Sequence, residues 1–312
     1  MKRKAAWGVA ILGLLVLSGD ALCGIVNLSL GHRPMVDPVR VGPPPLRYRV
    51  AVLGDAQKGI RNLANVLEAV KRENADFMIQ TGDFVSSNDE GHYRLVALVL
   101  DRAGLGRPCV VPGNHDIKGD PSRFVREFGD LERRWTWGRV HYVIVNNASG
   151  LPPEIPYLET WVPKDRPVVL AMHVPPFDVK GNVHPGYEPF LAWLEKSRVS
   201  YLLCGHVHGY FRKQVGDTTV IVNGVGGDFD KWQLDQKVYA TMLEVDGTSI
   251  TDRVIELPPD HRVWENVEHL AIGHVAEAYR SSPVLSWALT MLLAALVGLS
   301  IGWLRLKPSP AA

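Results

Sequence analysis

Five short apolar runs in this 312-residue chain each end in side chains of the kind that bind metal ions. Helical stretches separate several of these runs, and strands that alternate with helices are typical of an α/β domain. Sites in open α/β sheets form at the carboxyl ends of the strands, so these side chains are expected to meet. The endings are Gly54-Asp55-Ala56-Gln57, Gly82-Asp83, Gly113-Asn114-His115-Asp116, His173 and Gly205-His206-Val207-His208.

Each of these polar residues has an ordinary structural explanation when it is taken alone. Asp55 and Asp83 suit turns or helix N-caps, and His173 suits a hydrogen-bonded position in a core. His206 and His208 are two residues apart, so in an extended segment they share one side, as in a metal site or on an exposed strand. The series of five endings, rather than any single residue, therefore indicates a metal centre.

The composition is that of a globular protein, with 46% hydrophobic and 21% charged residues. The 34 Lys and Arg residues nearly balance the 33 Asp and Glu residues, which leaves a formal net charge of +1. A chain with this net charge has no overall field to attract nucleic acid, so no nucleic-acid partner is expected. The three cysteines are too few for a disulfide framework.

Both ends of the chain carry apolar segments beside basic residues. Residues 1–30 begin with Lys2, Arg3 and Lys4 and continue into an apolar run, which predicts a cleaved signal peptide or an uncleaved signal anchor. Residues 283–304 contain no charged residue. As a helix they would cover a hydrocarbon core of about 30 Å, which predicts a transmembrane helix, with a buried core helix as the alternative.

The segments between these ends complete the expected organisation. We expect a Pro-rich linker at 31–47, the α/β domain at 48–258, an amphipathic juxtamembrane helix at 259–282 and a basic tail at 305–312. The apolar positions within 259–282 suit packing on the domain as well as contact with a membrane surface. Basic residues flank both apolar end segments, so the positive-inside rule predicts cytoplasmic termini and an extracytoplasmic domain, on a bacterial inner membrane or a plasma membrane.

The order of the motifs over residues 54–208 resembles that of the calcineurin-like metallophosphoesterase superfamily. The specific part of the resemblance is Gly-Asn-His-Asp at 113–116 together with Gly-His-Val-His at 205–208. It implies an α/β fold in which two mixed β-sheets pack as a sandwich flanked by helices, here with terminal transmembrane helices added. It also implies metal-dependent hydrolysis of phosphate esters. Together with the apolar end segments, this leads us to expect a phosphomonoester, phosphodiester or pyrophosphate substrate at the membrane surface, with a lipid head group among the candidates.

The same resemblance implies two divalent metal ions. Asp55 and His208 would bind the first ion, and Asp83 would bridge both ions. The residues implied for the second ion are Asn114, His173 and His206. Two cations about 3.5 to 4 Å apart hold phosphoryl oxygens between them and acidify the water that attacks phosphorus. Oxygen and nitrogen donors suit Mn or Fe, with Zn as a further candidate.

Three further site residues complete what the resemblance implies. His115 would act as general acid for the leaving oxygen, and Asp116 would orient its imidazole. The superfamily usually has a His where this chain has Gln57, so Gln57 is expected to be a weak ligand of the first ion. The alternative function is a non-catalytic metal-binding or scaffolding membrane protein on the same fold. His115 argues against it, because a metal binder needs no acid outside the ligand shell.

Overall fold

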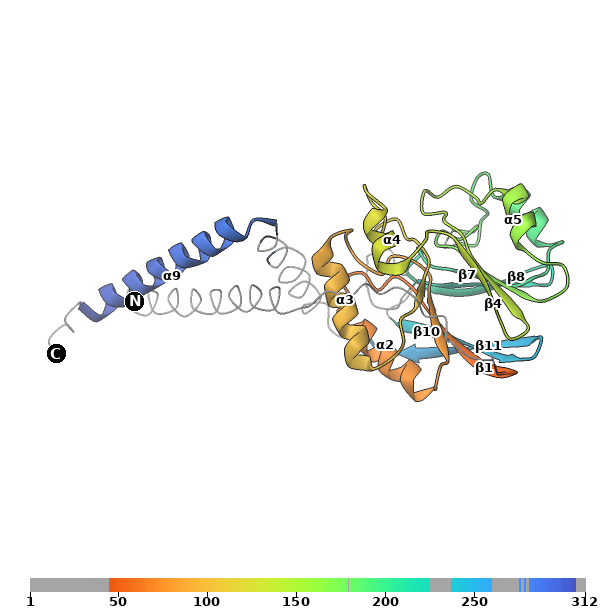
Figure 1. The fold of residues 1–312 in the computed structure, drawn as a ribbon, viewed down its shortest axis with the longest axis horizontal. Coiled ribbons are helices and arrows are strands. Elements are labelled where there is room, and N and C mark those ends of the chain that lie inside the picture. Colours follow the sequence, from red (N-terminus) through yellow and green to blue (C-terminus); the bar gives the residue numbers. More distant parts are fainter. Residues whose placement is uncertain are drawn as a thin grey trace. The chain divides into compact units, whose positions relative to one another are not determined.

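The fold is seen in a computed structural model of the chain (Figure 1). The structure describes residues 45–178, 180–224, 237–259, 275, 278 and 281–306. The chain divides into two compact units, one of residues 33–88 and 95–265 and one of residues 1–32, 89–94 and 266–312. The expected signal segment 1–30 lies outside the described residues, as do most of the linker 31–47, the helix 259–282 and the tail 305–312.

The larger unit contains a first sheet of five strands in the order β11-β10-β1-β2-β3. The strands β1, β2 and β3 run parallel, whereas β10 is antiparallel to both β1 and β11, so the sheet is mixed. The Asp246-Gly247 turn joins β10 to β11 in a hairpin, with a φ of 63° at Gly247. The bounds are β1 (Arg47–Leu53), β2 (Phe77–Gln80), β3 (Cys109–Val110), β10 (Val238–Asp246) and β11 (Ser249–Leu257).

A second sheet of six strands has the order β4-β5-β6-β7-β9-β8. Its four inner strands run parallel, and the edge strands β4 and β8 pair antiparallel with their neighbours. Neither edge strand was expected from the sequence, because both alternate exposed with partly buried side chains instead of forming apolar runs. The bounds are β4 (Arg133–Trp137), β5 (Val140–Ile144), β6 (Val168–Ala171), β7 (Val199–Cys204), β8 (Tyr210–Val215) and β9 (Thr218–Asn223).

Apolar side chains from both sheets meet in one core. This core includes Val50 and Val52 of β1, Tyr142 of β5 and Leu203 of β7. Successive side chains of a strand point to opposite faces, so the residues between these positions face away from the core. In the second sheet they include Leu202, which belongs to another apolar cluster on the outer face. The expected fold of two mixed sheets with helices is confirmed.

Helices cover the outer faces of the sheets (Figure 1). The helix α2 (Ile60–Arg72) lies against β10 and β11 and buries apolar residues at helical spacing, among them Leu63, Val66 and Val70. On the second sheet, Leu158 of α5 (Ile155–Trp161) and Phe190 of α6 (Glu188–Leu194) join the outer apolar cluster. Two further helices are α3 (Glu90–Ala103) and α4 (Ser122–Phe128).

The smaller unit contains the helix α9 (Pro283–Leu306), where the apolar run predicts a helix. Large apolar side chains of α9 are exposed, with Val284 at 85% and Leu299 at 71%. In the part of the chain that the structure describes, no helix is long and apolar enough to cross a membrane. The prediction of terminal transmembrane helices is corrected accordingly to an apolar C-terminal helix, and residues 1–30 lie outside the described part.

Candidate metal centre

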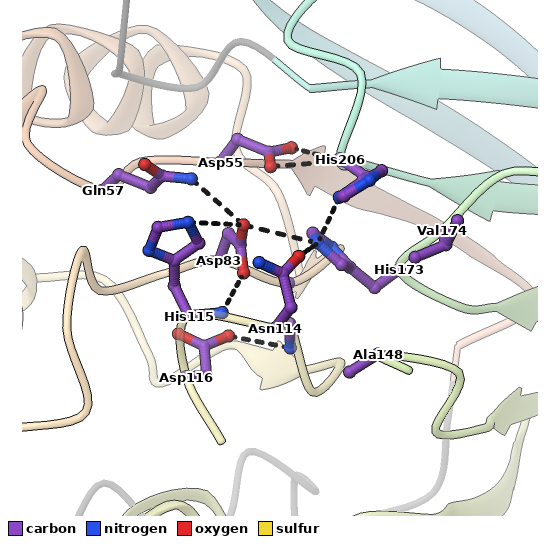
Figure 2. Close-up of polar contacts among 12 residues, drawn as sticks. Asp55, Gln57, Asp83, Asn114, His115, Asp116, Ala148, His173, Val174 and His206 are labelled. Carbon is purple, nitrogen blue, oxygen red and sulfur yellow. Dashed lines mark hydrogen bonds and ion pairs between the residues drawn. The ribbon is translucent and has the colours of Figure 1, made fainter. Parts of the chain in front are cut away.

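The carboxyl ends of strands from both sheets bring the predicted ligands together (Figure 2). Asp55 follows β1, Asp83 follows β2 and Asn114 follows β3 in the first sheet. His173 follows β6, and the pair His206 and His208 follows β7 in the second sheet. Among the described residues, two groups of Asp and His side chains are close enough to hold a metal ion, with ligand atoms within 4.8 Å of one another.

One group consists of Asp83, His173 and His206. The Nε2 atom of His173 lies 3.4 Å from Oδ2 of Asp83, 3.3 Å from Nδ1 of His206 and 3.1 Å from Oδ1 of Asn114. The Nδ1 atom of His173 is 2.8 Å from the carbonyl oxygen of Thr81 and donates to it, so Nε2 is the ring nitrogen that faces the other ligand atoms and could bind a metal ion. Three other potential ligand atoms therefore lie within 3.4 Å of Nε2 of His173.

The other group consists of Asp55, Asp83 and His208. The Nε2 atom of His208 lies 3.5 Å from Oδ1 of Asp55. Gln57 joins this group, because its Nε2 atom donates to Oδ2 of Asp83 at 3.0 Å and lies 3.3 Å from Nε2 of His208. Figure 2 shows the amide nitrogen of Gln57, rather than its oxygen, turned toward Asp83. The carboxylate of Asp83 thus belongs to both groups.

The backbone of this centre is unusual in its torsion angles. Six described residues other than glycine have a positive φ, and all but Asn74 belong to the centre. Such left-handed conformations cost of the order of 1–3 kcal/mol each and persist where the surrounding structure holds them. The strain is therefore concentrated in the turns that aim the ligands. The residues and φ angles are Asp55 (46°), Gln57 (37°), Asp83 (54°), His206 (71°) and His208 (47°).

Close packing requires a glycine at position 82, directly before Asp83. Gly82 has a φ of 98°, and a Cβ atom at this position would lie 2.3 Å from Nδ1 of His173. Its backbone is also tied to the end of β2, because the N–H of Gly82 donates to the side-chain Oε1 of Gln80 at 2.8 Å. Any larger residue at position 82 would displace the His173 ring from the centre.

The charges of Asp83, His173 and His206 influence one another's pKa values. Burial alone would lower the pKa of His173, but the charge and hydrogen bond of Asp83 raise this pKa to about 9. Burial likewise opposes ionisation of Asp83, but His173 outweighs burial and holds the pKa of Asp83 below its usual range. Burial, followed by the charge of His173, lowers the pKa of His206 to about 4. One protonated imidazole thus serves as the counter-charge of Asp83.

Asp55 has no comparable compensation in this state. Its side chain is fully buried, and burial raises the pKa of its carboxyl group well above the usual range. The N–H of His206 donates to both carboxylate oxygens of Asp55, at 3.1 and 2.9 Å. A cation beside these oxygens would favour the ionised form of Asp55, as a metal ion does for its carboxylate ligands. The donor set of two buried carboxylates, three imidazoles and the carboxamides of Asn114 and Gln57 therefore fits divalent metal ions.

His115 lies at the edge of this centre, with 39% of its side chain exposed. Its Nε2 atom is 4.0 Å from Oδ2 of Asp83. Its Nδ1 atom is 2.8 Å from the carbonyl oxygen of Ser86, and its backbone N–H donates to Oδ1 of Asp83 at 2.8 Å. These two contacts leave Nε2 facing the shared carboxylate.

Asp116 makes contacts other than those expected. Its side chain is fully buried and accepts hydrogen bonds from the backbone N–H groups of Val85 and Gly113, both at 3.0 Å. Burial, together with the charge of Asp83, raises the pKa of Asp116 to about 7. Asp116 therefore braces the loops after β2 and β3, while the carbonyl of Ser86 makes the hydrogen bond to the His115 imidazole that was expected of Asp116.

Two asparagines that support the centre were missed in the sequence. The side chain of Asn147 bonds the backbone of His173 and Val174, and that of Asn223 donates to the carbonyl of Val52 at 2.6 Å. Both follow or end a buried apolar strand, β5 and β9 respectively. The other site residues were identified as polar residues at strand ends. The same pattern holds for Asn147 and Asn223.

Comparison with known proteins supports this interpretation of the site. Residues 48–210 match the model of a protein family described as calcineurin-like phosphoesterase. This segment contains both groups of candidate metal ligands. A search of curated proteins finds no match.

Solved structures with a similar fold include a purple acid phosphatase from yellow lupin (Lupinus luteus) seeds, with a TM-score of 0.51 and 14% identity. The similarity covers 69% of this chain and 54% of the lupin protein, so the chain spans about half the length of that relative. A putative 5'-nucleotidase from Staphylococcus aureus has a TM-score of 0.47 and 16% identity, covering 72% of this chain and 57% of that one. At 14% identity the similarity to the lupin protein is one of fold. The family match rests on the motif-bearing segment itself, and the chain belongs to the calcineurin-like phosphoesterase family.

Proposed function

We propose that the protein hydrolyses phosphate esters with the help of two divalent metal ions. The observation that carries this proposal is the position of Asp83, whose carboxylate belongs to both groups of candidate ligands. A carboxylate with two oxygens suits a bridging role between two cations. Metal-dependent hydrolysis of phosphate esters is also the general activity of the family.

In this proposal the ligands of each ion are the side chains that lie close together in the structure. Asp55 and His208 hold the first ion, with Gln57 as a weaker ligand once its amide turns its oxygen inward. The second ion is held by Asn114, His173 and His206, whose ligand atoms converge. When bound, the two ions supply charge that stabilises the phosphoryl oxygens and acidifies the attacking water. The oxygen and nitrogen donors of both groups suit Mn or Fe, with Zn as a further candidate.

His115 acts as the general acid. Its Nδ1 atom is committed to the Ser86 carbonyl, so Nε2 is the atom that gives a proton to the leaving oxygen. The partial exposure of its ring lets the imidazole take up a new proton from solvent after each turnover. Asp116 acts through the backbone, because it fixes the N–H groups of Val85 and Gly113 on either side of the site.

The substrate class follows from the accessibility of the site. The segment between Asp83 and Gly113 forms the single helix α3 (Glu90–Ala103) with its flanking turns, so no capping domain is inserted between these two motifs. His206 is exposed, so a bulky substrate can reach the ligands. We therefore propose a phosphomonoester, phosphodiester or pyrophosphate, with a lipid head group among the candidates.

Location at a bacterial inner membrane or plasma membrane, with the catalytic domain outside the cytoplasm, is a further part of the proposal. It is supported by the exposed apolar side chains of α9, such as Leu285 and Met291, which suit contact with a membrane surface, and by the basic residues beside both apolar end segments. Protease added outside intact cells or spheroplasts should digest the domain. Protection until lysis would contradict this location.

The proposed activity is tested with metal-supplemented assays on a panel of monoesters, diesters, pyrophosphate and lipid phosphates. We expect hydrolysis of at least one class that stops on chelation and returns with added metal. The variant Asp83→Asn, assayed in parallel, controls for contaminating phosphatases. If the folded, metal-loaded protein has no more activity than this variant on any class, the scaffolding alternative holds instead.

A further inference from the structure

A cavity of about 560 Å³ lies on the outer face of the second sheet. Trp135 and Trp137 of β4 pack toward the core between the sheets, so Arg134 and Thr136 face the opposite side. The helix α5 and the segment that leads from it to β6 form the other wall. The lining side chains that matter here are Arg134, Thr136, His141, Trp161, Lys164 and Arg166.

This cavity is separate from the metal centre. His141 pairs in register with Val168, the first residue of β6, so the cavity lies where β5 and β6 begin. The metal ligand His173 follows the other end of β6. None of the metal-centre residues lines the cavity, so a ligand here would not touch the candidate metal ligands.

The cavity carries an excess of positive charge. Arg134, Lys164 and Arg166 line it together with a single acidic residue, Glu159. Arg166 is paired with Asp165 at 2.6 Å. Within the described residues, no carboxylate lies within ion-pair distance of Arg134 or Lys164. Burial, and then the charges of Arg134 and Arg166, lower the pKa of His141, so its ring is neutral and adds no charge.

Arg134 is held in position from two sides. Its Nη1 atom donates to the carbonyl oxygen of Thr160 at 3.1 Å. Its guanidinium group lies 4.9 Å from the centroid of the Trp161 ring, as in a cation–π contact. A guanidinium group has five N–H donors in a planar fork, so most of them remain for a ligand. A side chain fixed in this way loses little entropy when it binds an anion.

We propose that this cavity binds the phosphate group of a small organic molecule. Arg134 and Lys164 supply the charge for the phosphate oxygens, and Arg fits their geometry with two parallel hydrogen bonds. Trp161 and Val162 supply an apolar wall for the organic part. The volume lies within the range of about 300–1,000 Å³ that is typical of small-molecule sites and exceeds what a bare phosphate ion fills. The site does not depend on the proposed hydrolysis, because it shares no residue with the metal centre.

The test is calorimetric titration with phenylphosphonate, whose P–C bond is not an ester and is not hydrolysed. Metal-free protein is used, so that the anion finds no cation at the metal centre. We expect the parent to bind and the Arg134→Ala variant to bind about tenfold more weakly, as for the loss of a charged hydrogen-bond partner. The exposed Arg72 of α2 gives the matched control, because Arg72→Ala removes the same charge from the other sheet's outer layer.

Lys164→Ala is a second variant at an exposed position and should also weaken binding. Vesicles of phosphatidylcholine with and without phosphatidic acid, sedimented with the parent and with Arg134→Ala, distinguish a lipid head group from a soluble phosphate as the source of the anion. The proposal is overturned if the parent gives no binding heat at millimolar phenylphosphonate. It is also overturned if Arg134→Ala and Lys164→Ala bind as the parent does, or if Asp83→Asn abolishes binding while Arg134→Ala leaves it unchanged.

Discussion

The side-chain oxygen of Asn147 accepts a hydrogen bond of 2.9 Å from the backbone N–H of His173, the imidazole of which belongs to the ligand group with Asp83 and His206. The same oxygen accepts from the N–H of Val174 at 3.0 Å, and the amide nitrogen donates to the carbonyl of Val174 at 2.7 Å. Both Asn147 and His173 are buried. One carboxamide therefore fixes the backbone that aims the His173 ring.

We expect Asn147→Ala to weaken metal binding without removing any ligand. Loss of the carboxamide leaves two buried N–H groups unpaired, at about 1–3 kcal/mol each in the free energy of unfolding. Loss of such a supporting contact typically costs about 10- to 100-fold in metal affinity. Metal titration and denaturant unfolding measure the two effects. The exposed Asn65 on α2 provides the control variant Asn65→Ala, and equal metal affinity of both variants would contradict the positioning role.

Asp83→Asn should remove metal binding from both groups at once, because Asp83 is common to them. The substitution keeps an oxygen that can accept from the N–H of His115, so the loop should keep its conformation. We expect hydrolysis to fall to background and the metal content to fall toward zero, with an unchanged circular dichroism spectrum. Asp217→Asn, at an exposed turn, controls for the change in charge. Full metal content in Asp83→Asn would rule out the shared-ligand role.

His115→Ala should separate the general acid from the metal ligands. Because Nε2 of His115 lies 4.0 Å from the nearest carboxylate oxygen of Asp83 and its Nδ1 atom is bonded to Ser86, the metal content should match that of the parent. The turnover number should fall by about 10²- to 10⁴-fold, the usual contribution of general acid catalysis. Elemental analysis beside steady-state kinetics checks both claims. A parallel loss of metal would show that His115 is a ligand.

The ends of the buried strands could be predicted from the sequence because each strand is a run of consecutive apolar residues that stops at a polar residue. A continuous apolar run is a strand that is covered on both faces, and β2 (Phe77–Gln80) ends just before the predicted Gly82-Asp83 ending. The edge strands β4 and β8 escaped prediction because one of their faces is exposed, as the side chains of Arg134 and Arg212 are. Their position depends on neighbouring strands, which the local pattern does not encode.

The supporting contacts of the site were predictable only in part. Side chains carry their chemistry in the sequence, so the ligands could be named. Every residue has a backbone carbonyl, so the sequence does not show which carbonyl will accept a hydrogen bond in the site. The carbonyls of Ser86 and Thr81 orient the rings of His115 and His173. Asp116 shows the consequence, because its neighbour in the sequence is His115 but its hydrogen bonds go to Val85 and Gly113.

Metal ions should stabilise the folded protein as well as activate it. A ligand that binds only the native state stabilises it by about 2.7 kcal/mol at a concentration one hundred times its dissociation constant. Thermal unfolding with added Mn²⁺ should therefore show a higher midpoint than unfolding with a chelator. Asp83→Asn should show no such metal-dependent shift. An equal shift in this variant would place the stabilising ion elsewhere in the protein.

Gln57→His should strengthen metal binding at the first group. The amide of Gln57 lies 3.3 Å from Nε2 of His208 and 3.0 Å from Oδ2 of Asp83, so a side chain at position 57 reaches the ligand atoms of this group. An imidazole nitrogen is a stronger donor to Mn, Fe or Zn than a carboxamide oxygen. In the parent we expect this ion to be the first lost on mild chelation, and added Mn²⁺ to restore activity.

Competition with a chelator of known affinity measures the difference between Gln57→His and the parent, and we expect the variant to bind the weaker ion about tenfold more tightly. The exposed Gln214 on β8 gives the matched control Gln214→His, which adds an imidazole far from any ligand group and should leave metal affinity unchanged. If Gln57→His binds the weaker ion no more tightly than the parent, then Gln57 is not a ligand. Its amide then acts as the hydrogen-bond donor to Asp83 that the structure shows, and it positions that carboxylate for the remaining ligands.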